Sequence, residues 1–353
     1  PRACRSGRSK RTSTTHSSRA WKARRISSAL RTSRRTASSP PATTCCASAR
    51  RTAPAGSSSR SRSGAREAVD ADVSVTLLTH NAGPLLDRVL TAVRGQSTAR
   101  SVEIVAVDSG STDGTRAVLA QHEARVVAIP SREFDFGLTR DRVFEESRGR
   151  VVVCISQDAV PAHERWLENL VAPLDGPKFA ASCGRSIPDS DRGFDQFPWE
   201  RNGLFYFTRE MRAFAAKHGR GLSNANSAIR RDVWEQLRFG AQPIGEDFKF
   251  QIALQAAGHT VAFPDGAEVL HHHTYSMRAL FKRCRNEGLG LRTLGCPYRA
   301  IDLVRDLANV AVWRAWAREL ARGGLRTPAA LAFPLARPCA VYAGSRFAGR
   351  FLP

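Results

Sequence analysis

The sequence lacks several signatures that would place it in a common class. It has no run of about 18 apolar residues, so we predict no membrane-spanning helix. The motifs Gly-x-Gly-x-x-Gly and Gly-x4-Gly-Lys-Ser/Thr are both missing, which argues against a dinucleotide enzyme and against a P-loop ATPase. The eight cysteines do not form the two Cys-x-x-Cys pairs that a zinc ribbon needs, so a zinc ribbon is not expected. We interpret the thiols as reduced, which suits a cytosolic protein.

Acidic residues are absent from the first 66 positions, although these positions carry 17 of the 54 Lys and Arg residues. The other 287 residues carry 37 basic and 32 acidic residues, so their net charge is only +5. Arg, Ser, Thr and Ala without a hydrophobic period cannot bury enough apolar surface to fold. We therefore expect residues 1–68 to be a disordered basic tail.

Four interpretations compete for this tail: a basic arm for nucleic acid or acidic lipid, a transit peptide, an inert segment, or a start-site artefact. The chain begins with Pro1, its first methionine is Met211, and ordered patterning starts abruptly near Val69. We favour the artefact or the inert tail. Aromatic side chains do not interleave with the arginines, so we expect no nucleic-acid partner.

From Val73 onward, apolar runs alternate with segments of helical spacing. We expect strands at 73–79, 102–107, 125–129, 151–155, 179–183 and 260–263, and helices at 85–93, 115–122, 138–147, 166–171 and 247–257. This order predicts an α/β fold of βαβ units, with a mostly parallel central sheet flanked by helices. Residues 185–222 are predicted to be an irregular insertion over the site, and residues 301–322 a single amphipathic helix with Trp313 and Trp316.

Asp108 ends the second predicted strand and precedes a tight Ser-Gly-Ser-Thr-Asp-Gly turn. A carboxylate at this edge of a sheet can accept a hydrogen bond from the ring N–H of a pyrimidine. The first strand delivers Thr79, His80 and Asn81 to the same edge, so two loops are expected to converge there. Asp113 is interpreted as a cap of the next helix.

Asp158 follows the apolar run 151–155 and precedes a helix that we expect to start at Pro161. A hard cation such as Mg²⁺ or Mn²⁺ neutralises a diphosphate while using one or two protein carboxylates, and Asp158 is the candidate. The alternative is that Asp158 is the N-cap of that helix.

Two later segments carry further candidate groups. Asp247 lies beside Glu246 in the first turn of a predicted helix, where it could act as a base toward a hydroxyl or be an ordinary acidic pair. His271 and His273 alternate along an extended segment, so they could point together and complete a metal site. We assign His272 between them to a polar surface cluster.

These segments, in this order, resemble family 2 glycosyltransferases of the GT-A fold. The resemblance runs from about residue 73 to residue 290 and is strongest at 73–81, 107–115, 148–153 and 245–247. Segments 134–141 and 156–161, and 342–349 with 352–353 near the far end, are similar to the rhamnosyltransferase-like branch. We accordingly expect a GT-A domain over 69–297 and a helical C-terminal extension over 298–353.

The resemblance implies a role for each candidate residue. The residues assigned to the nucleotide sugar are Thr79, His80, Asn81, Asp108, Arg140 and Asp158. Asp158 and His271 are assigned to the metal, and Asp247 is the catalytic base. The loop that faces acceptor and donor contains Asn224, Asn226 and Glu246. Three residues depart from the family pattern. Ser156 replaces the first acid of the Asp-x-Asp motif, which weakens the expected metal affinity. Asp141 replaces an Asn, which adds negative charge near the diphosphate, and Phe136 replaces a His.

The implied activity is an inverting transfer of a sugar from a nucleotide-diphosphate donor to a hydroxyl of a glycan or a lipid-linked acceptor. Mg²⁺ or Mn²⁺ is the implied cofactor. The similarity to the rhamnosyltransferase-like branch implies rhamnose as the sugar. We expect a cytoplasmic protein with peripheral contact at the inner face of the membrane. Two other classes remain open: a glycosidase, which needs no nucleotide pocket, and a basic nucleic-acid- or membrane-binding protein that acts through residues 1–66 beside a non-catalytic α/β domain.

Overall fold

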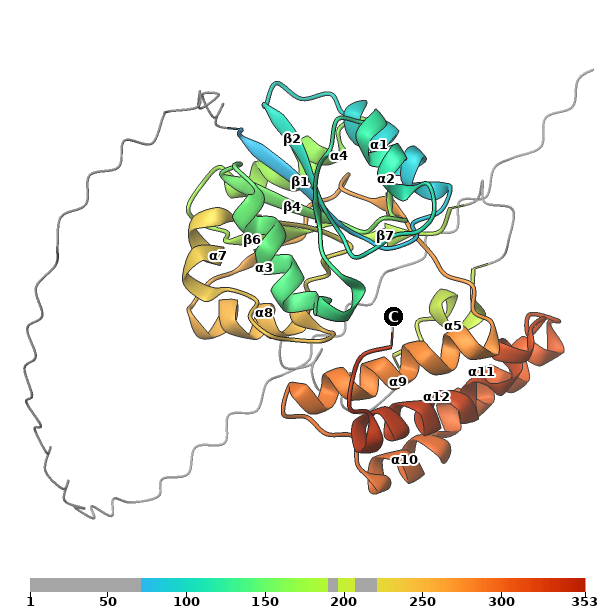
Figure 1. Cartoon of the computed structure of the whole chain (residues 1–353). Helices are drawn as coiled ribbons and strands as arrows, with labels where there is room; N and C mark the ends of the chain where they lie inside the picture. The colour runs from blue at the N-terminus through green and yellow to red at the C-terminus, as the bar shows by residue number, and fades with distance from the viewer. Residues whose placement is uncertain (1–70, 190–195, 207–220, 353) are drawn as a thin grey trace, which may run out of the picture. The chain divides into compact units, whose positions relative to one another are not determined.

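The computed structural model describes residues 71–189, 196–206 and 221–352 (Figure 1). The predicted tail, residues 1–68, and part of the predicted insertion lie outside these residues. Across the described part of the chain, no helix is both long and apolar enough to cross a membrane.

A seven-stranded sheet forms the centre of the α/β part. Its strands in spatial order are β3 (Arg125–Ala128), β2 (Val102–Asp108), β1 (Val73–Thr79), β4 (Val151–Ile155), β8 (Asn226–Arg230), β6 (Ala181–Cys183) and β9 (Val261–Ala262). Strand β8 pairs antiparallel with both of its neighbours, whereas all other neighbouring pairs are parallel. The prediction of a mostly parallel sheet is therefore confirmed. Strand β8 was not predicted, because its sequence Asn-Ser-Ala-Ile-Arg contains no apolar run.

Helices cover both faces of this sheet. Successive side chains of a strand point to opposite sides, so each face packs against its own set of helices. Val75 and Leu77 of β1 belong to the core shared with α1 (Leu85–Arg94), α2 (Thr115–Gln121) and α4 (Trp166–Val171). Val105 and Val107 of β2 belong to the core shared with α3 (Phe136–Glu146), α7 (Arg231–Leu237) and α8 (Glu246–Ala256). The predicted strands and helices between residues 73 and 155 are confirmed to within two residues at each end.

The topology brings several chain segments to one edge of the sheet. The parallel strands β1, β2 and β4 end there, and the antiparallel β8 begins there, because Ile155 of β4 pairs with Asn226 of β8. In open α/β sheets, ligands bind at the carboxyl ends of the parallel strands. The fold thus places the candidate site at this edge.

A second, small sheet consists of β5 (Val160–Pro161), β10 (Val269–Leu270) and β7 (Ser186–Ile187). The expected helix start at Pro161 was wrong, because Pro161 pairs with Val269 at the edge of this sheet and the helix begins at Trp166. Proline is tolerated in an edge strand, where its missing N–H is not needed by a neighbour. Asp158 is consequently not the N-cap of a helix.

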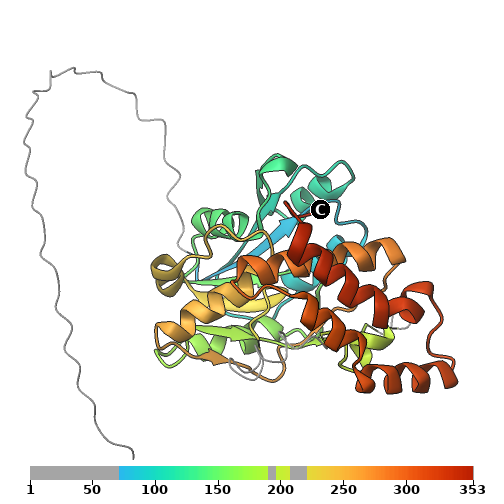
Figure 2. The ribbon, with the colours of Figure 1, turned by 90° about the horizontal axis from the view of Figure 1, so that it is seen from below.

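Four long helices follow the α/β part: α9 (Met277–Thr293), α10 (Ala300–Leu307), α11 (Val310–Ala321) and α12 (Pro328–Phe347), drawn orange to red in Figures 1 and 2. The prediction of one helix over 301–322 was wrong, because the chain turns at Ala308 and Asn309. The Asn309 side chain accepts a hydrogen bond from the Ala311 amide and starts α11 anew. The remaining short helices among the described residues are α5 (Pro198–Arg201) and the 3₁₀ turns Ser131–Glu133 and Ala172–Leu174.

These helices share an apolar core that also includes Phe197, Trp199 and Phe205 from the α5 segment. Helix α12 packs closely along α9, because a Cβ at Gly344 would overlap the carbonyl oxygen of Arg285. The core contains residues from both sides of position 297, and the boundary predicted there stays a prediction.

Candidate functional site

Asp108, at the carboxyl end of β2, is completely buried and fully hydrogen-bonded. Its Oδ2 accepts hydrogen bonds from the hydroxyls of Thr79 (3.1 Å) and Ser111 (2.5 Å). Its Oδ1 accepts from the Ser111 amide (3.1 Å) and from Nε of Arg116 (2.7 Å). Burial raises the pKa of Asp108, but these donors outweigh it and hold the pKa below its ordinary value. A fixed negative charge therefore lies at the sheet edge.

The loop after β1 is hydrogen-bonded to the loop after β2, as the sequence predicts. Asn81 has a φ of 44°, a conformation that Asn tolerates better than most residues. Its side-chain oxygen accepts from the Thr112 amide (2.9 Å), and its own amide donates to the Ser111 hydroxyl (2.9 Å). Nδ1 of His80 lies 3.1 Å from the carbonyl oxygen of Ser109. The two loops thus form one hydrogen-bonded unit.

Gln157 joins the loop after β4 to the same unit. Its Oε1 accepts from the His80 amide (2.9 Å), and its Nε2 donates to the His80 carbonyl (3.3 Å). The Ser156 amide donates to the carbonyl of Ala225, just before β8 (3.2 Å). Asp158 is the next residue after Gln157, so its segment shares this edge with Asp108.

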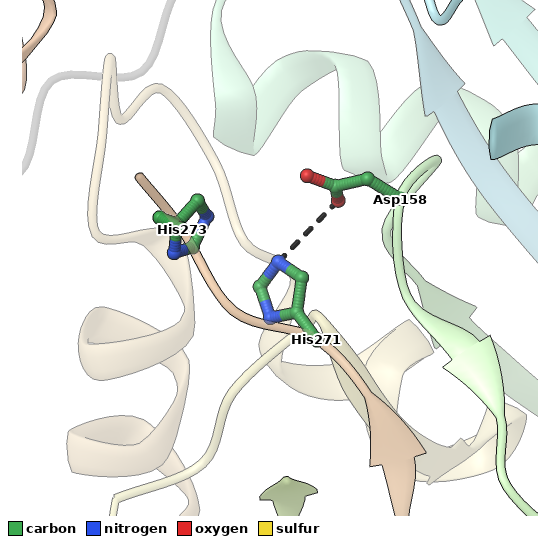
Figure 3. Close-up of side chains that lie close together, drawn as sticks. All are labelled: Asp158, His271 and His273. Carbon is green, nitrogen blue, oxygen red and sulfur yellow. Dashed lines mark ion pairs between the residues drawn. The ribbon is translucent and has the colours of Figure 1, made fainter. Parts of the chain in front are cut away.

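Asp158, His271 and His273 form a cluster of three candidate metal ligands (Figure 3). One ligand atom from each residue lies within 4.8 Å of the other two. Nε2 of His271 is 3.4 Å from Oδ1 of Asp158, and the two imidazole rings meet edge to face with their centroids 4.6 Å apart. The pairing of β5 with β10 explains this meeting, because β5 follows Asp158 and β10 leads into His271.

Electrostatics keep the carboxylate of this cluster charged. Burial raises the pKa of Asp158, but the hydrogen bond from His271 and the charges of His271 and His273 lower it to about 2. A carboxylate oxygen and two imidazole nitrogens form a donor set that suits a first-row divalent cation such as Mn²⁺ better than Mg²⁺, which takes oxygen ligands. The residues present therefore fit a bound divalent cation.

Only part of this cluster was predicted from the sequence. His271 was assigned to the metal, and His273 was absent from the assigned set although the alternation of side chains indicated it. The surface position expected for His272 was wrong: its exposed fraction is 3%, and its Nδ1 accepts a hydrogen bond from the Asp189 amide (3.0 Å). Alternate side chains of this segment thus divide between the cluster and the interior.

Glu200 holds His273 in place and was not predicted. Its Oε1 lies 3.3 Å from Nδ1 of His273 and accepts a hydrogen bond from the Tyr275 hydroxyl (3.0 Å), while its Oε2 accepts from the His273 amide (3.3 Å). Burial raises the pKa of Glu200, but its contacts with His273 outweigh burial and lower the pKa below its ordinary value. With Nδ1 bonded to a carboxylate, Nε2 of His273 is the ring nitrogen available to a metal.

Glu246, the first residue of α8, lies in a buried polar cluster. Its Oε1 accepts a hydrogen bond from the side-chain amide of Asn224 (3.1 Å) and lies 3.7 Å from Nη2 of Arg140. Arg140 is 5% exposed, and its Nε and Nη1 have no hydrogen-bond partner among the described residues. Buried donors of this kind cost free energy unless a water or a ligand meets them.

Asp247 follows Glu246 and is partly exposed, although protein surrounds it on most sides. Burial and the negative charge of Glu246 raise the pKa of Asp247 to about 7. The Phe248 amide donates to its Oδ1 (2.9 Å), which acts in the opposite direction but does not prevail. Gly245, with a φ of 78°, makes the sharp entry into α8 that presents both acids. A carboxyl group of near-neutral pKa is suited to general-base chemistry.

Hydrogen bonds thus connect the segments that contain Asp108, Asp158 and Asp247 at this edge of the sheet. The Asp108 loop is bonded to the Thr79–Asn81 loop, this loop to Gln157, and Ser156 to the segment before β8. Asn224 of that segment reaches Glu246, beside Asp247.

Comparisons with known proteins agree with this geometry. The family model described as "Glycosyl transferase family 2" matches residues 74–238. The chain is 29% identical over 226 residues to the O-antigen chain rhamnosyltransferase RfbN of Salmonella typhimurium. The matched region covers 62% of this chain and 71% of that protein. It is 27% identical to the O-antigen chain rhamnosyltransferase WbaN of Salmonella anatum, over 61% of this chain and 71% of that protein. Residues 74–238 thus match glycosyltransferase family 2.

The fold of this glycosyltransferase is GT-A. The chain is similar to a solved structure of mannosyltransferase PcManGT from Pyrobaculum calidifontis, with a TM-score of 0.52 and 18% sequence identity, over 78% of this chain and 86% of that one. At this identity the likeness concerns the fold alone. The prediction of a GT-A glycosyltransferase is confirmed.

All three residues assigned to the acceptor and donor loop are buried, and Asn226 makes its hydrogen bonds away from the candidate site. Asn226 is 1% exposed; its Oδ1 accepts from Nε1 of Trp166 (3.0 Å), and its Nδ2 donates to the carbonyls of Ala267 (2.7 Å) and Arg185 (3.3 Å). These bonds fix β8 against α4 and the small sheet. Asn224, by contrast, reaches Glu246 as described.

Two departures from the family pattern have structural partners. Asp141 accepts hydrogen bonds from Nε1 of Trp234 (2.8 Å) and from the amides of Phe239 (2.9 Å) and Gly240 (2.8 Å), so its charge is held by the α3–α7 packing. Phe136 packs edge to face against Phe351 near the C-terminus, with centroids 5.4 Å apart. The extra negative charge expected beside a diphosphate from Asp141 stays a prediction.

Proposed function

We propose that this glycosyltransferase transfers rhamnose, with inversion, from a nucleoside-diphosphate donor to a hydroxyl of a glycan. The observation that carries the proposal is Asp247, a carboxyl group with its pKa raised to about 7, on the same sheet edge as the fixed charge of Asp108 and the cluster around Asp158. A base, a nucleotide site and a cation site together are what transfer from a nucleotide sugar requires.

Donor binding is assigned to the edge formed by β1 and β2. Asp108 would accept a hydrogen bond from the ring N–H of a pyrimidine in exchange for one of its present donors. Arg116 is the donor most easily displaced, because its side chain is half exposed. Nε and Nη1 of buried Arg140, which find no partner in the described part of the chain, would donate to oxygen atoms of the donor's diphosphate or sugar.

A divalent cation would be held by Asp158, His271 and His273, with Glu200 orienting His273. Such a cation stabilises negative charge on a departing diphosphate. Ser156 offers no carboxylate in the position of the first acid of the Asp-x-Asp motif. The two imidazoles supply the ligands that this position lacks.

In the reaction, Asp247 would take the proton from an acceptor hydroxyl while the hydroxyl oxygen attacks the anomeric carbon. Attack from the face opposite the diphosphate inverts the configuration at that carbon. The proton passes to Asp247, and the bond from the anomeric carbon to the diphosphate oxygen breaks. Glu246 and Arg140 set the charge around the base without touching the acceptor.

The choice of sugar and acceptor draws on the relatives, two of which are named O-antigen chain rhamnosyltransferases. A glycan hydroxyl is the corresponding acceptor class. The rival interpretation of a basic binding protein beside a non-catalytic α/β domain is not favoured, since the family 2 domain lies in the α/β part.

A panel of nucleotide sugars tests the proposal. A ligand that binds only the folded protein raises the free energy of unfolding, by about 2.7 kcal/mol at a concentration of a hundred times its Kd. The unfolding temperature rises accordingly. We expect thymidine-diphosphate rhamnose with Mn²⁺ to raise it more than guanosine-diphosphate mannose or uridine-diphosphate glucose. Proton NMR of the product then reads the anomeric configuration. Retention of configuration, or release of free sugar from a nucleotide-free glycoside, would contradict the assignment.

A further inference from the structure

We propose that α10, α11 and α12 carry a surface that docks on a bilayer containing anionic phospholipid. Charge is unevenly distributed along the chain after residue 66. Residues 298–352 contain nine Lys or Arg and three Asp or Glu, whereas residues 67–297 contain 28 and 29. The excess positive charge outside the first 66 residues therefore belongs to these three helices and their connections.

None of the three acids in residues 298–352 is on the surface. Asp302, Asp306 and Glu319 are 2%, 3% and 8% exposed. Asp306 accepts a hydrogen bond from the Tyr298 hydroxyl (2.7 Å), and Glu319 pairs with Arg201 (2.9 Å). Within residues 298–352, all of which the structure describes, every exposed charge is therefore positive.

We name the exposed residues of this region the basic–apolar face. Its arginines are Arg299, Arg305, Arg314, Arg318, Arg322, Arg326, Arg346 and Arg350. Among the described residues, 13 large apolar side chains are exposed, and seven of them belong to this face: Ile301, Val304, Val310, Leu320, Leu331, Leu335 and Phe347. Basic and large apolar side chains are thus mixed on the same helices.

Helical spacing gathers these residues into stripes. Val310, Arg314 and Arg318 are four residues apart on α11, and Leu331 and Leu335 are four apart on α12. The opposite stripe of α12 contains buried Phe333 and Val341, which belong to the core that α12 shares with α9. The exposed stripes are therefore the sides of the helices that this core leaves uncovered.

Two half-buried tryptophans reinforce this face. The indole N–H of Trp313 donates to the Leu307 carbonyl (2.7 Å), and that of Trp316 donates to the Leu331 carbonyl (2.9 Å). Tryptophan and tyrosine are favoured at the membrane–water boundary, because they combine a large apolar body with one polar group. Arginine can likewise lay its stem on acyl chains while its head meets a phosphate.

The composition of this face favours a bilayer over other partners. A second copy of the chain would bring like charges together. A nucleic acid would match the charge but would not bury seven large apolar side chains. An anionic bilayer meets both, because phosphates attract the arginines and the acyl boundary takes up the apolar groups. This docking goes beyond the proposed reaction, and it does not depend on which sugar is transferred.

Vesicle co-sedimentation of the full chain tests the inference without any sugar donor. We expect binding to vesicles of phosphatidylcholine with phosphatidylglycerol, weaker binding at higher salt, and little binding to phosphatidylcholine alone. The variant Arg314→Glu/Arg318→Glu removes two surface cations from α11. Loss of each basic residue lowers the affinity roughly fivefold, so we expect a fall of at least about 25-fold.

A matched control makes the same charge change elsewhere. Arg132→Glu/Arg165→Glu alters two exposed arginines of the α/β part, and we expect its vesicle affinity to fall far less. All variants keep residues 1–66 with their 17 basic residues, so any contribution of that segment cancels in the comparison.

The contribution of the apolar side chains to vesicle binding is tested with a second pair of variants, one on the face and one control. Val304→Ser/Leu335→Ser should weaken vesicle binding while its salt dependence persists, and Ile252→Ser/Phe263→Ser, on exposed apolar residues of the α/β part, should not. Circular dichroism melting verifies that each variant is folded. Equal vesicle affinity of the wild type and the two face variants would overturn the inference. So would a wild type without preference for phosphatidylglycerol, or duplex DNA that binds this face more tightly than vesicles do.

Transfer to a soluble acceptor is measured in parallel, and the face variants should retain it. Loss of transfer with vesicle binding intact would count against the proposed function alone. A wild type that transfers the sugar but does not bind vesicles would count against the docking surface alone.

Discussion

The guanidinium of Arg140 and the carboxylate of Glu246 form a buried ion pair, with Nη2 and Oε1 3.7 Å apart and each residue 5% exposed. The pair lies beside Asp247, so its two charges act on the same carboxyl group in opposite directions. Glu246 raises the pKa of Asp247 and Arg140 lowers it, with burial as the largest cause of the rise to about 7. The environment of Asp247 is thus set by burial and by these two buried charges.

The pH dependence of kcat/KM should report this arrangement. Asp247 accepts a proton only when it is deprotonated, so activity should rise with pH through about 7 and level off above it. In Glu246→Gln, a negative charge is removed and Arg140 loses its counter-ion, and both changes favour the charged form of Asp247. We expect the rising limb to move to lower pH. A limb that stays in place in Glu246→Gln would contradict the role given to Glu246.

Replacement of the base tests the chemical step itself. Asp247→Asn keeps the size of the side chain but cannot take a proton, so kcat should fall about 10²- to 10⁴-fold. Donor affinity, measured by calorimetry, should be nearly unchanged. Asp232→Asn is the matched control, because Asp232 also lies in the first turn of a helix but pairs with Arg230 at the surface. Unchanged turnover in Asp247→Asn would reject the assignment.

The sheet and its functional edge were predictable, because long apolar runs such as 73–79 and 151–155 identify buried strands. Residues that directly follow such runs, Asp108 among them, could be assigned to the carboxyl edge. The turn between α10 and α11 was less visible, because apolar spacing continues across Ala308 and Asn309 and only the capping of Asn309 interrupts it.

The cation cluster was only partly predictable, for a physical reason. Strands β5 and β10 are two residues long, so neither has a pattern that reveals their pairing, and that pairing brings Asp158 to His271. The contact of Glu200 with His273 joins residues 73 positions apart, between a short helix and an extended segment. No local spacing encodes such a contact.

Glu200 should influence cation binding through His273. Glu200→Gln removes the carboxylate that holds Nδ1 of His273, and outer partners of this kind typically contribute 10- to 100-fold to metal affinity. We expect Mn²⁺ affinity, measured by calorimetry or electron paramagnetic resonance without a donor, to fall within that range. Glu164→Gln, on an exposed surface residue, serves as the control. Unaltered Mn²⁺ affinity in Glu200→Gln would show that His273 needs no such support.

The contact between α9 and α12 depends on the absence of a side chain at Gly344. A Cβ there would overlap the carbonyl oxygen of Arg285, which belongs to helix backbone and cannot move aside alone. Gly344→Ala should therefore push the helices apart and destabilise the protein by about 1–3 kcal/mol, the usual cost of overpacking. Gly349→Ala is the control, because a Cβ at Gly349 would meet nothing within 4 Å. Urea unfolding measures both variants, and equal midpoints would mean that the packing of α12 on α9 tolerates a methyl group at this position.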